Sequence, residues 1–273
     1  AAGTTAGDAS GHGFVGTIAN ATWTTAGKFG GALSFNGANS WVTVADNALF
    51  HLTTGMTLEA WVKPNALDGW TNIIMKERPA GLAYALYASD NTDNPPAGYI
   101  NRSTDVSSVG TSALSLGAWT HLATTYDGAN LRLYVNGTLV RTQAVTGAIT
   151  SSTSPIRIGG DSVWGEYFDG LIDEIRVYGR ALSQSEVQAD MNTAVNAPVI
   201  PPSEGASAPI VMAVSKSKPA AKAPAKQVKV VSKPGASVPK PRPAIKPQPK
   251  AVFSVASALR PRGLSHSLRD WLA

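Results

Sequence analysis

The sequence of 273 residues contains no cysteine. Disulfide frameworks, thiolate metal sites and cysteine nucleophiles are therefore excluded, because all of them need that side chain. The chain also has no apolar run near the roughly 18 residues that a membrane-spanning helix requires. We therefore expect no transmembrane segment.

Charged residues are few, at 15% of the chain, and they are unevenly distributed. Residues 1–196 carry 10 Lys and Arg against 16 Asp and Glu, a net charge of −6, whereas residues 197–250 carry 10 against 1, a net charge of +9. The isoelectric point near 9.4 thus reflects the second region. A nucleic-acid-binding domain needs a basic face of its own, so we expect no nucleic-acid partner for the first region.

Short alternating segments fill the first 180 residues. From Met56 to Val62, apolar residues alternate with Thr57, Glu59 and Trp61, the pattern of a strand with one buried face. Asn136-Gly137 after another such run predicts a tight hairpin, because both positions of a type I′ turn need positive φ. Strands at this spacing without intervening helices predict an all-β antiparallel sandwich.

One short helix is predicted at the end of this region. Ser183 and Glu186 have the spacing of a capping box, which marks a helix N-terminus. We expect the helix to close a domain over residues 1–195.

Residues 197–250 contain 12 of the chain's 18 prolines. A segment of this kind, also rich in lysine and alanine, cannot bury enough apolar surface to offset the entropy lost on folding. We predict a disordered, basic, proline-rich linker over residues 196–250, either a spacer or a contact for anionic surfaces. Residues 251–273 stay unassigned, with a short helix as one interpretation.

Several segments of the first region together resemble the laminin-G-like, concanavalin A-like jelly-roll family. They are, with their residue numbers, DASGHG (8–13), GGALSFNG (30–37), MTLEAWV (56–62), WTHLA (119–123), LYVNG (133–137), DGLIDEIRVY (169–178) and RALS (180–183). The resemblance implies an antiparallel jelly-roll β-sandwich of two packed sheets, with a binding or adhesive role rather than catalysis. Members are often attached to bacterial surface proteins and polysaccharide-degrading enzymes.

This sequence departs from the family at its start. Members usually open with a hydrophobic strand before the segment that here begins at Ala1, and that strand pairs with the closing strand, here Leu171–Tyr178. We therefore expect a domain that lacks its first strand and leaves a sheet edge open.

Asp8 and Asp173 are the predicted ligands of a structural calcium ion. Asp173 has the same parity as Leu171, Ile175 and Val177 and should point with them, and a buried carboxylate is costly unless it is paired or bound to a metal. The family resemblance also implies calcium near these two residues. The alternative is that Asp8 caps its own turn while Asp173 accepts hydrogen bonds from nearby amides.

A sugar site is predicted in two polar loops. Trp70 lies in one loop, and Trp164 and Tyr167 lie in another. An aromatic ring can stack on the apolar face of a sugar, while Asn and Arg side chains grip its hydroxyls, and Asn101 and Arg102 are candidates for that role. Packing under a loop is the alternative for both tryptophans, and we expect Trp41, Trp61 and Trp119 to pack in the core or on a sheet face.

Catalysis is not supported by the sequence. Related glucanases place their carboxylates as Glu-x-Asp-x-x-Glu on one strand, because retaining hydrolysis needs two carboxylates about 5 Å apart. Leu171 and Arg176 stand here where the glutamates would be.

We therefore predict a non-catalytic module that binds a polysaccharide, glycan or surface, in a secreted, extracellular or cell-surface bacterial protein. The alternatives are a domain that binds a cell-surface protein, and an accessory part of a polysaccharide hydrolase or lyase.

Overall fold

The computed structural model describes residues 4–91 and 94–195. The predicted linker (196–250) and the C-terminal segment (251–273) lie outside the described residues. In the part that is described, no helix combines the length and hydropathy that a membrane span requires.

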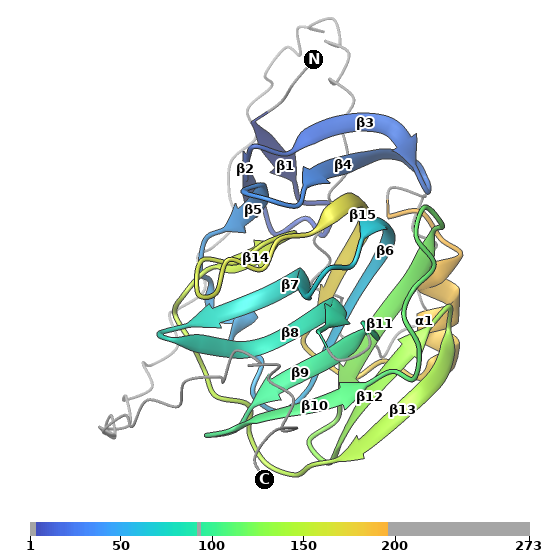
Figure 1. Cartoon of the computed structure of the whole chain (residues 1–273). Helices are drawn as coiled ribbons and strands as arrows, with labels where there is room; N and C mark the ends of the chain where they lie inside the picture. The colour runs from blue at the N-terminus through green and yellow to red at the C-terminus, as the bar shows by residue number, and fades with distance from the viewer. Residues whose placement is uncertain (1–3, 92–93, 196–273) are drawn as a thin grey trace, which may run out of the picture. The chain divides into compact units, whose positions relative to one another are not determined.

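The described chain folds as a sandwich of two antiparallel sheets (Figure 1). Sheet A contains, in spatial order, β1 (Thr5–Gly7), β2 (Val15–Ala19), β5 (Trp41–Val44), β14 (Ile156–Ile158), β7 (Trp70–Arg78), β8 (Gly81–Asp90), β9 (Ala97–Asn101) and β10 (Asp105–Val109). Sheet B contains β13 (Thr138–Ala144), β12 (Asn130–Val135), β11 (Thr120–Tyr126), β6 (Met56–Ala66), β15 (Asp169–Tyr178), β4 (Gly30–Asn36) and β3 (Thr22–Gly27). The predicted all-β jelly-roll class is confirmed.

Two short helices complete the fold. A 3-10 turn, η1 (Ala48–Phe50), follows β5, and α1 (Gln184–Met191) lies beside β13 (Figure 1). The predicted capping box is present, because Ser183 accepts a hydrogen bond from the Glu186 amide and the Glu186 side chain accepts one from the Ser183 amide.

The alternation along β6 correctly identifies its core face. Met56, Leu58, Ala60 and Val62 belong to the main core between the sheets. The hairpin prediction is also confirmed, since Asn136 and Gly137 both have positive φ and join β12 to β13.

The parity prediction for β15 is wrong. A β-bulge shifts the register between Asp173 and Arg176, and Glu174 adopts a φ of 55°. Ile172 faces the core before the bulge, whereas Ile175 and Val177 face it afterwards. An extra residue of this kind reverses which side chains point inward, so Asp173 does not share a face with Ile175 and Val177.

β15 is paired differently along its two halves. Residues Asp169–Ile172 pair with both β6 and β4, whereas Arg176–Tyr178 pair with β6 alone within the described chain.

Candidate functional site

The outer face of sheet A carries side chains that do not belong to the main core. Neighbouring strands bring together one cross-strand row, which consists of Thr43, Arg157, Met75, Ala85 and Tyr99. The adjacent residues Ile74, Leu86 and Ile100 belong to the core between the sheets. Because successive strand side chains point to opposite faces, the row faces away from sheet B.

Four aromatic residues gather on this face. Trp70, Tyr87 and Tyr99 contact one another edge to face, with ring centroids 5.3, 5.7 and 5.5 Å apart. Trp164 packs against the same apolar cluster from the loop between β14 and β15. Tyr87 is fully buried, whereas Trp70, Tyr99 and Trp164 are half-buried. We call these four residues the aromatic cluster.

Two buried carboxylates shape the loop that presents Trp164. The Asp161 side chain accepts hydrogen bonds from four successive amides, those of residues 163–166. Glu77 accepts hydrogen bonds from the amide and the hydroxyl of Ser162, at 2.7 and 2.8 Å. Burial raises the pKa of Asp161, although the loop amides oppose that shift. The loop is therefore organised around Asp161 from within.

Replacing Asp161 with alanine should disorder this loop and destabilise the protein by about 2–3 kcal/mol, because four partly buried amides lose their acceptor. Urea unfolding of the variant measures that loss. Asp161→Asn keeps an acceptor oxygen and should lose less. Equal stability of the alanine variant and the parent would show that the loop does not depend on this carboxylate.

The same loop carries Tyr167, which belongs to a second aromatic pair. Its ring stacks on Trp41 with centroids 5.8 Å apart and an interplanar angle of 26°. The Arg157 guanidinium lies 4.7 Å from the centroid of the Trp41 ring and also contacts Glu77 at 3.2 Å. Trp41 thus packs on a sheet face, as its strand pattern predicted.

The structure therefore places Trp70 and Trp164 in one cluster and Tyr167 in a neighbouring pair. Sequence reasoning missed Tyr87 and Tyr99 as members of this surface. The spacing of Ala85 and Tyr87 by two residues was the available signal, but β8 is buried on both faces and shows no alternation of polar with apolar residues.

Asn101 and Arg102 lie apart from these ring contacts, at the turn between β9 and β10. The Asn101 amide donates to Asp105 at 2.7 Å, and its oxygen accepts from Thr150 at 2.7 Å. Its hydrogen bonds hold the turn together, and its predicted role in sugar binding remains a prediction, as does that of Arg102.

The calcium prediction finds little support in the surroundings of its two ligands. Asp8 accepts hydrogen bonds from Ser10 and Phe14 in its own loop, and Asp173 accepts from the amides of Phe29 and Glu174. These neighbours are donors, whereas calcium requires several acceptor oxygens. The described residues contain no cluster of three or more acidic or histidine side chains able to hold a metal.

The two carboxylates, as arranged, therefore do not fit a calcium ion, and calcium remains a prediction. If it is right, melting temperature should be higher in calcium than in chelator, and Asp173→Asn should remove the difference. Identical melting in the two conditions would exclude it.

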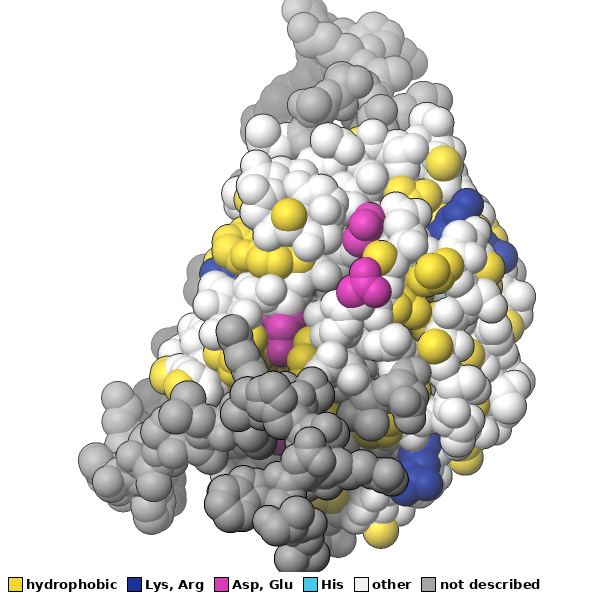
Figure 2. Space-filling model, in the orientation of Figure 1, with side chains coloured by type: hydrophobic (Ala, Val, Ile, Leu, Met, Phe, Trp, Pro, Cys, Tyr) yellow, Lys and Arg dark blue, Asp and Glu magenta, His cyan; other side chains and the backbone are white. Residues whose placement is uncertain are grey.

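Charge is sparse on the face shown in Figure 2. There Asp and Glu side chains lie toward the middle of the described surface, and Lys and Arg side chains lie near its margin. Next to the aromatic cluster, Glu166 accepts a hydrogen bond from the Tyr87 hydroxyl at 2.8 Å.

Comparison with known proteins agrees with this architecture. A family model described as the concanavalin A-like lectin/glucanases superfamily matches residues 36–188. Pappalysin-1 of Mus musculus is 34% identical over 82 residues, which are 28% of this chain and 5% of that protein. Pappalysin-1 of Homo sapiens is 26% identical over 156 residues, or 50% of this chain and 10% of that protein. The chain thus spans only a small part of these relatives.

Solved structures share the fold at low sequence identity. Domain 4 of AbnA, an extracellular arabinanase of Geobacillus stearothermophilus solved with arabinotriose, is 23% identical, with a TM-score of 0.56 over 69% of this chain and 87% of that domain. The binding domain of botulinum neurotoxin serotype G is 16% identical, with a TM-score of 0.54 over 68% of this chain and 47% of that one.

Proposed function

Because the chain belongs to the concanavalin A-like lectin/glucanases superfamily, we propose that it is a non-catalytic module that binds a neutral polysaccharide on the outer face of sheet A. The aromatic cluster is the observation that carries this proposal. Partly exposed rings on a rigid sheet offer flat apolar surfaces to the C–H faces of sugar rings. We further propose that the module works outside the cell, in a secreted or surface protein.

A non-catalytic role is supported by what the carboxylates of β15 do. Asp173 is fully buried and accepts backbone hydrogen bonds, and Glu174 forms a buried ion pair with Arg176 at 3.1 Å. Glycoside hydrolysis needs two carboxyl groups that flank the substrate. These two side chains are instead engaged in hydrogen bonds and an ion pair within the protein.

A neutral ligand is supported by the charges around the aromatic cluster. Glu77 and Glu166 lie near it, and Arg157 is already paired with Glu77. Anionic polysaccharides are recognised by unpaired Arg and Lys groups. Arg157 is therefore engaged with Glu77 and with the Trp41 ring and is not free to hold an anionic chain.

Binding should be tested with the full chain by affinity electrophoresis in gels that contain neutral polysaccharides, with arabinan as the first probe because a solved relative holds arabinotriose. One neutral polysaccharide should retard the protein. Trp164→Ala should weaken that binding by about tenfold to a hundredfold, as expected for a central aromatic contact. Val163→Ala, the matched control in the same loop, should bind like the parent.

Three results would contradict the proposal. Equal retardation of the Trp164→Ala and parent proteins would remove the aromatic cluster from the binding site. Failure of a folded sample to bind any neutral polysaccharide would favour the alternative of a surface that recognises another protein. Release of reducing ends would show that the module is catalytic.

A further inference from the structure

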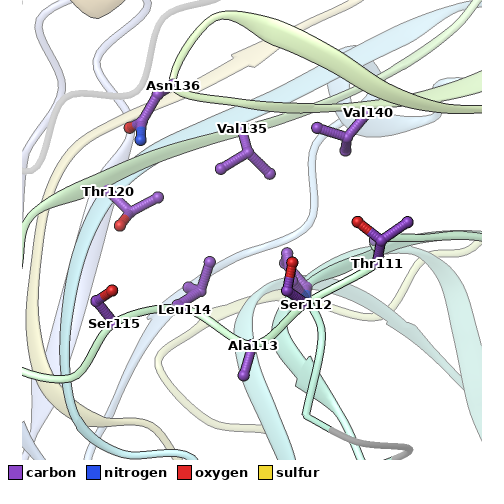
Figure 3. Close-up of a pocket in the computed structure, with 11 residues that line it drawn as sticks. Thr111, Ser112, Ala113, Leu114, Ser115, Thr120, Val135, Asn136 and Val140 are labelled. Carbon is purple, nitrogen blue, oxygen red and sulfur yellow. The ribbon is translucent and has the colours of Figure 1, made fainter.

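A hollow of about 200 Å³ lies at a different place in the fold, between the β10–β11 loop and the β12–β13 hairpin. Figure 3 shows Ser112 and Leu114 pointing from the loop toward Val135 and Val140 of the hairpin, whereas Ala113 points away. The hollow shares no residue with the aromatic cluster or with the Trp41–Tyr167 pair.

The wall of the hollow combines an apolar part with hydroxyl groups. Leu114, Val135 and Val140 provide the apolar part. The hydroxyl groups come from Thr111, Ser112, Ser115 and Thr120. None of the residues that line the hollow is charged. A site without cations or anions has no group to balance a phosphate, a carboxylate or an ammonium ion.

These hydroxyls are available to a ligand. Within the described part of the chain, no side-chain hydrogen bond occupies Thr111, Ser112, Ser115 or Thr120, whereas Asn136 uses its oxygen to accept from the His121 amide at 3.0 Å. The Asn136 amide nitrogen is left as a donor. Hydroxyl groups both donate and accept hydrogen bonds, so the site can match a ligand that does the same.

The hollow is held open by the fold. The loop is fixed at its start, where the Gly110 amide donates to Pro96 at 2.8 Å, and near its end, where the Gly117 amide donates to Pro64 at 2.7 Å. Thr120 and Val135 belong to strands of sheet B. Because these walls are set before a ligand arrives, binding does not have to order the loop.

We propose that this hollow binds one uncharged sugar ring, independently of the outer face of sheet A. A pyranose or furanose has an apolar C–H face for Leu114 and the two valines, and a rim of hydroxyls for the four Ser and Thr groups. The volume is below that of typical sites for drug-sized ligands, which suits a single ring. The proposal does not rest on the proposed function, since the two sites share no residue.

The test uses the full chain and saturation-transfer NMR with methyl glycosides of glucose, galactose, mannose, xylose and arabinose, and with glucuronate and glucosamine as charged probes. At least one uncharged glycoside should bind. Ser112→Phe places a ring inside the hollow and should weaken that binding by about tenfold or more. Leu116→Phe adds the same ring on the same loop at an exposed side chain that does not line the hollow, and should stay within about twofold of the parent.

Thr111→Val is a second test, because it removes one hydroxyl while keeping the shape of the side chain. It keeps the proposal testable if Ser112→Phe does not fold. The proposal is supported if glycoside binding is weaker in Ser112→Phe and in Thr111→Val but unchanged in Trp164→Ala. Binding lost only in Trp164→Ala would overturn this inference while supporting the proposed function. Binding of charged glycosides alone, or of none, would also overturn it.

Discussion

Replacing Glu59 with glutamine should make the protein lose stability as the pH falls from 6.5 toward 3, and replacing His121 with glutamine should not. The two side chains are fully buried on the outer face of sheet B, with His121 Nε2 3.3 Å from Glu59 Oε2. Burial lowers the pKa of His121 to about 3, and the Arg176 charge adds to that shift. Burial likewise raises the pKa of Glu59 well above its ordinary value, as does the charge of Asp190.

Burial therefore favours the uncharged form of both groups in the folded protein. Contact at this distance would also suit an ion pair, but complete burial favours the neutral pair, because the cost of removing two charges from water is poorly offset by their attraction. In the unfolded chain the two groups titrate near pH 4.5 and 6.5.

The two residues affect stability in opposite directions. The pKa of His121 is lower in the folded state, so the unfolded state binds more protons below pH 6.5 and stability falls by about 1.4 kcal/mol per pH unit toward pH 3. The pKa of Glu59 is higher in the folded state, so its contribution is complete below pH 4.5 and is lost as the pH rises. Between pH 4.5 and 6.5 these slopes oppose each other in the parent protein.

Urea unfolding at pH 4.5, 5.5 and 6.5 separates the two contributions. In Glu59→Gln only the histidine remains, and stability should drop with acid more steeply than in the parent. In His121→Gln only the glutamate remains. As the pH falls from 6.5 to 4.5, the free energy of unfolding of this variant should therefore rise relative to that of the parent. Parallel pH dependence in all three proteins would show that the pair does not titrate as described.

Replacing Gly170 with alanine should destabilise the fold by about 3 kcal/mol or more. Gly170 has a φ of 138°, and an added Cβ would lie 2.2 Å from the carbonyl oxygen of Lys63 and 2.9 Å from Cα of Pro64. Neither atom belongs to a flexible side chain, so β15 and β6 would have to separate. Backbone strain and overpacking each cost about 1–3 kcal/mol.

Gly117→Ala is the matched control for this substitution. Gly117 has a φ of 69°, but nothing lies within 4 Å of an added Cβ. Gly117→Ala should therefore lose only about 1–2 kcal/mol of stability, which is the cost of placing a side chain in the left-handed region. Melting temperatures of the two variants measure the difference, and similar losses would mean that the close approach of β15 to β6 is not what requires Gly170.

Sequence patterns predicted the fold correctly where the signal lies in residues close together in the chain. The alternation in β6, the Asn136-Gly137 turn and the Ser183–Glu186 capping box all depend on neighbouring residues, and all three are confirmed. The inward face of β15 was missed because its bulge at Asp173 and Glu174 depends on pairing with β6. The apolar pattern alone carries no sign of that extra residue.

The candidate site was predictable only in part. Trp70 and Trp164 were identified as separate loop residues, but their common cluster depends on the order of strands in sheet A. Tyr87 lies in β8, which is buried on both faces, so alternation gives no signal there. Tyr99 is the one half-buried residue of the short strand β9, which has too few residues to show a pattern. Asn101 has a side chain suited to sugar binding, yet its amide is engaged within a turn.

Hydroxyl-radical footprinting of the full chain, with and without a saturating neutral polysaccharide that retards it, tests the central claim most directly. The proposed function predicts that bound glycan protects Trp70, Tyr99 and Trp164 on the outer face of sheet A. Trp61, buried on sheet B with its indole N–H donating to the Met191 carbonyl, should react equally in both samples. Unchanged oxidation of the aromatic cluster while the glycan is bound would place the binding surface elsewhere and contradict the account.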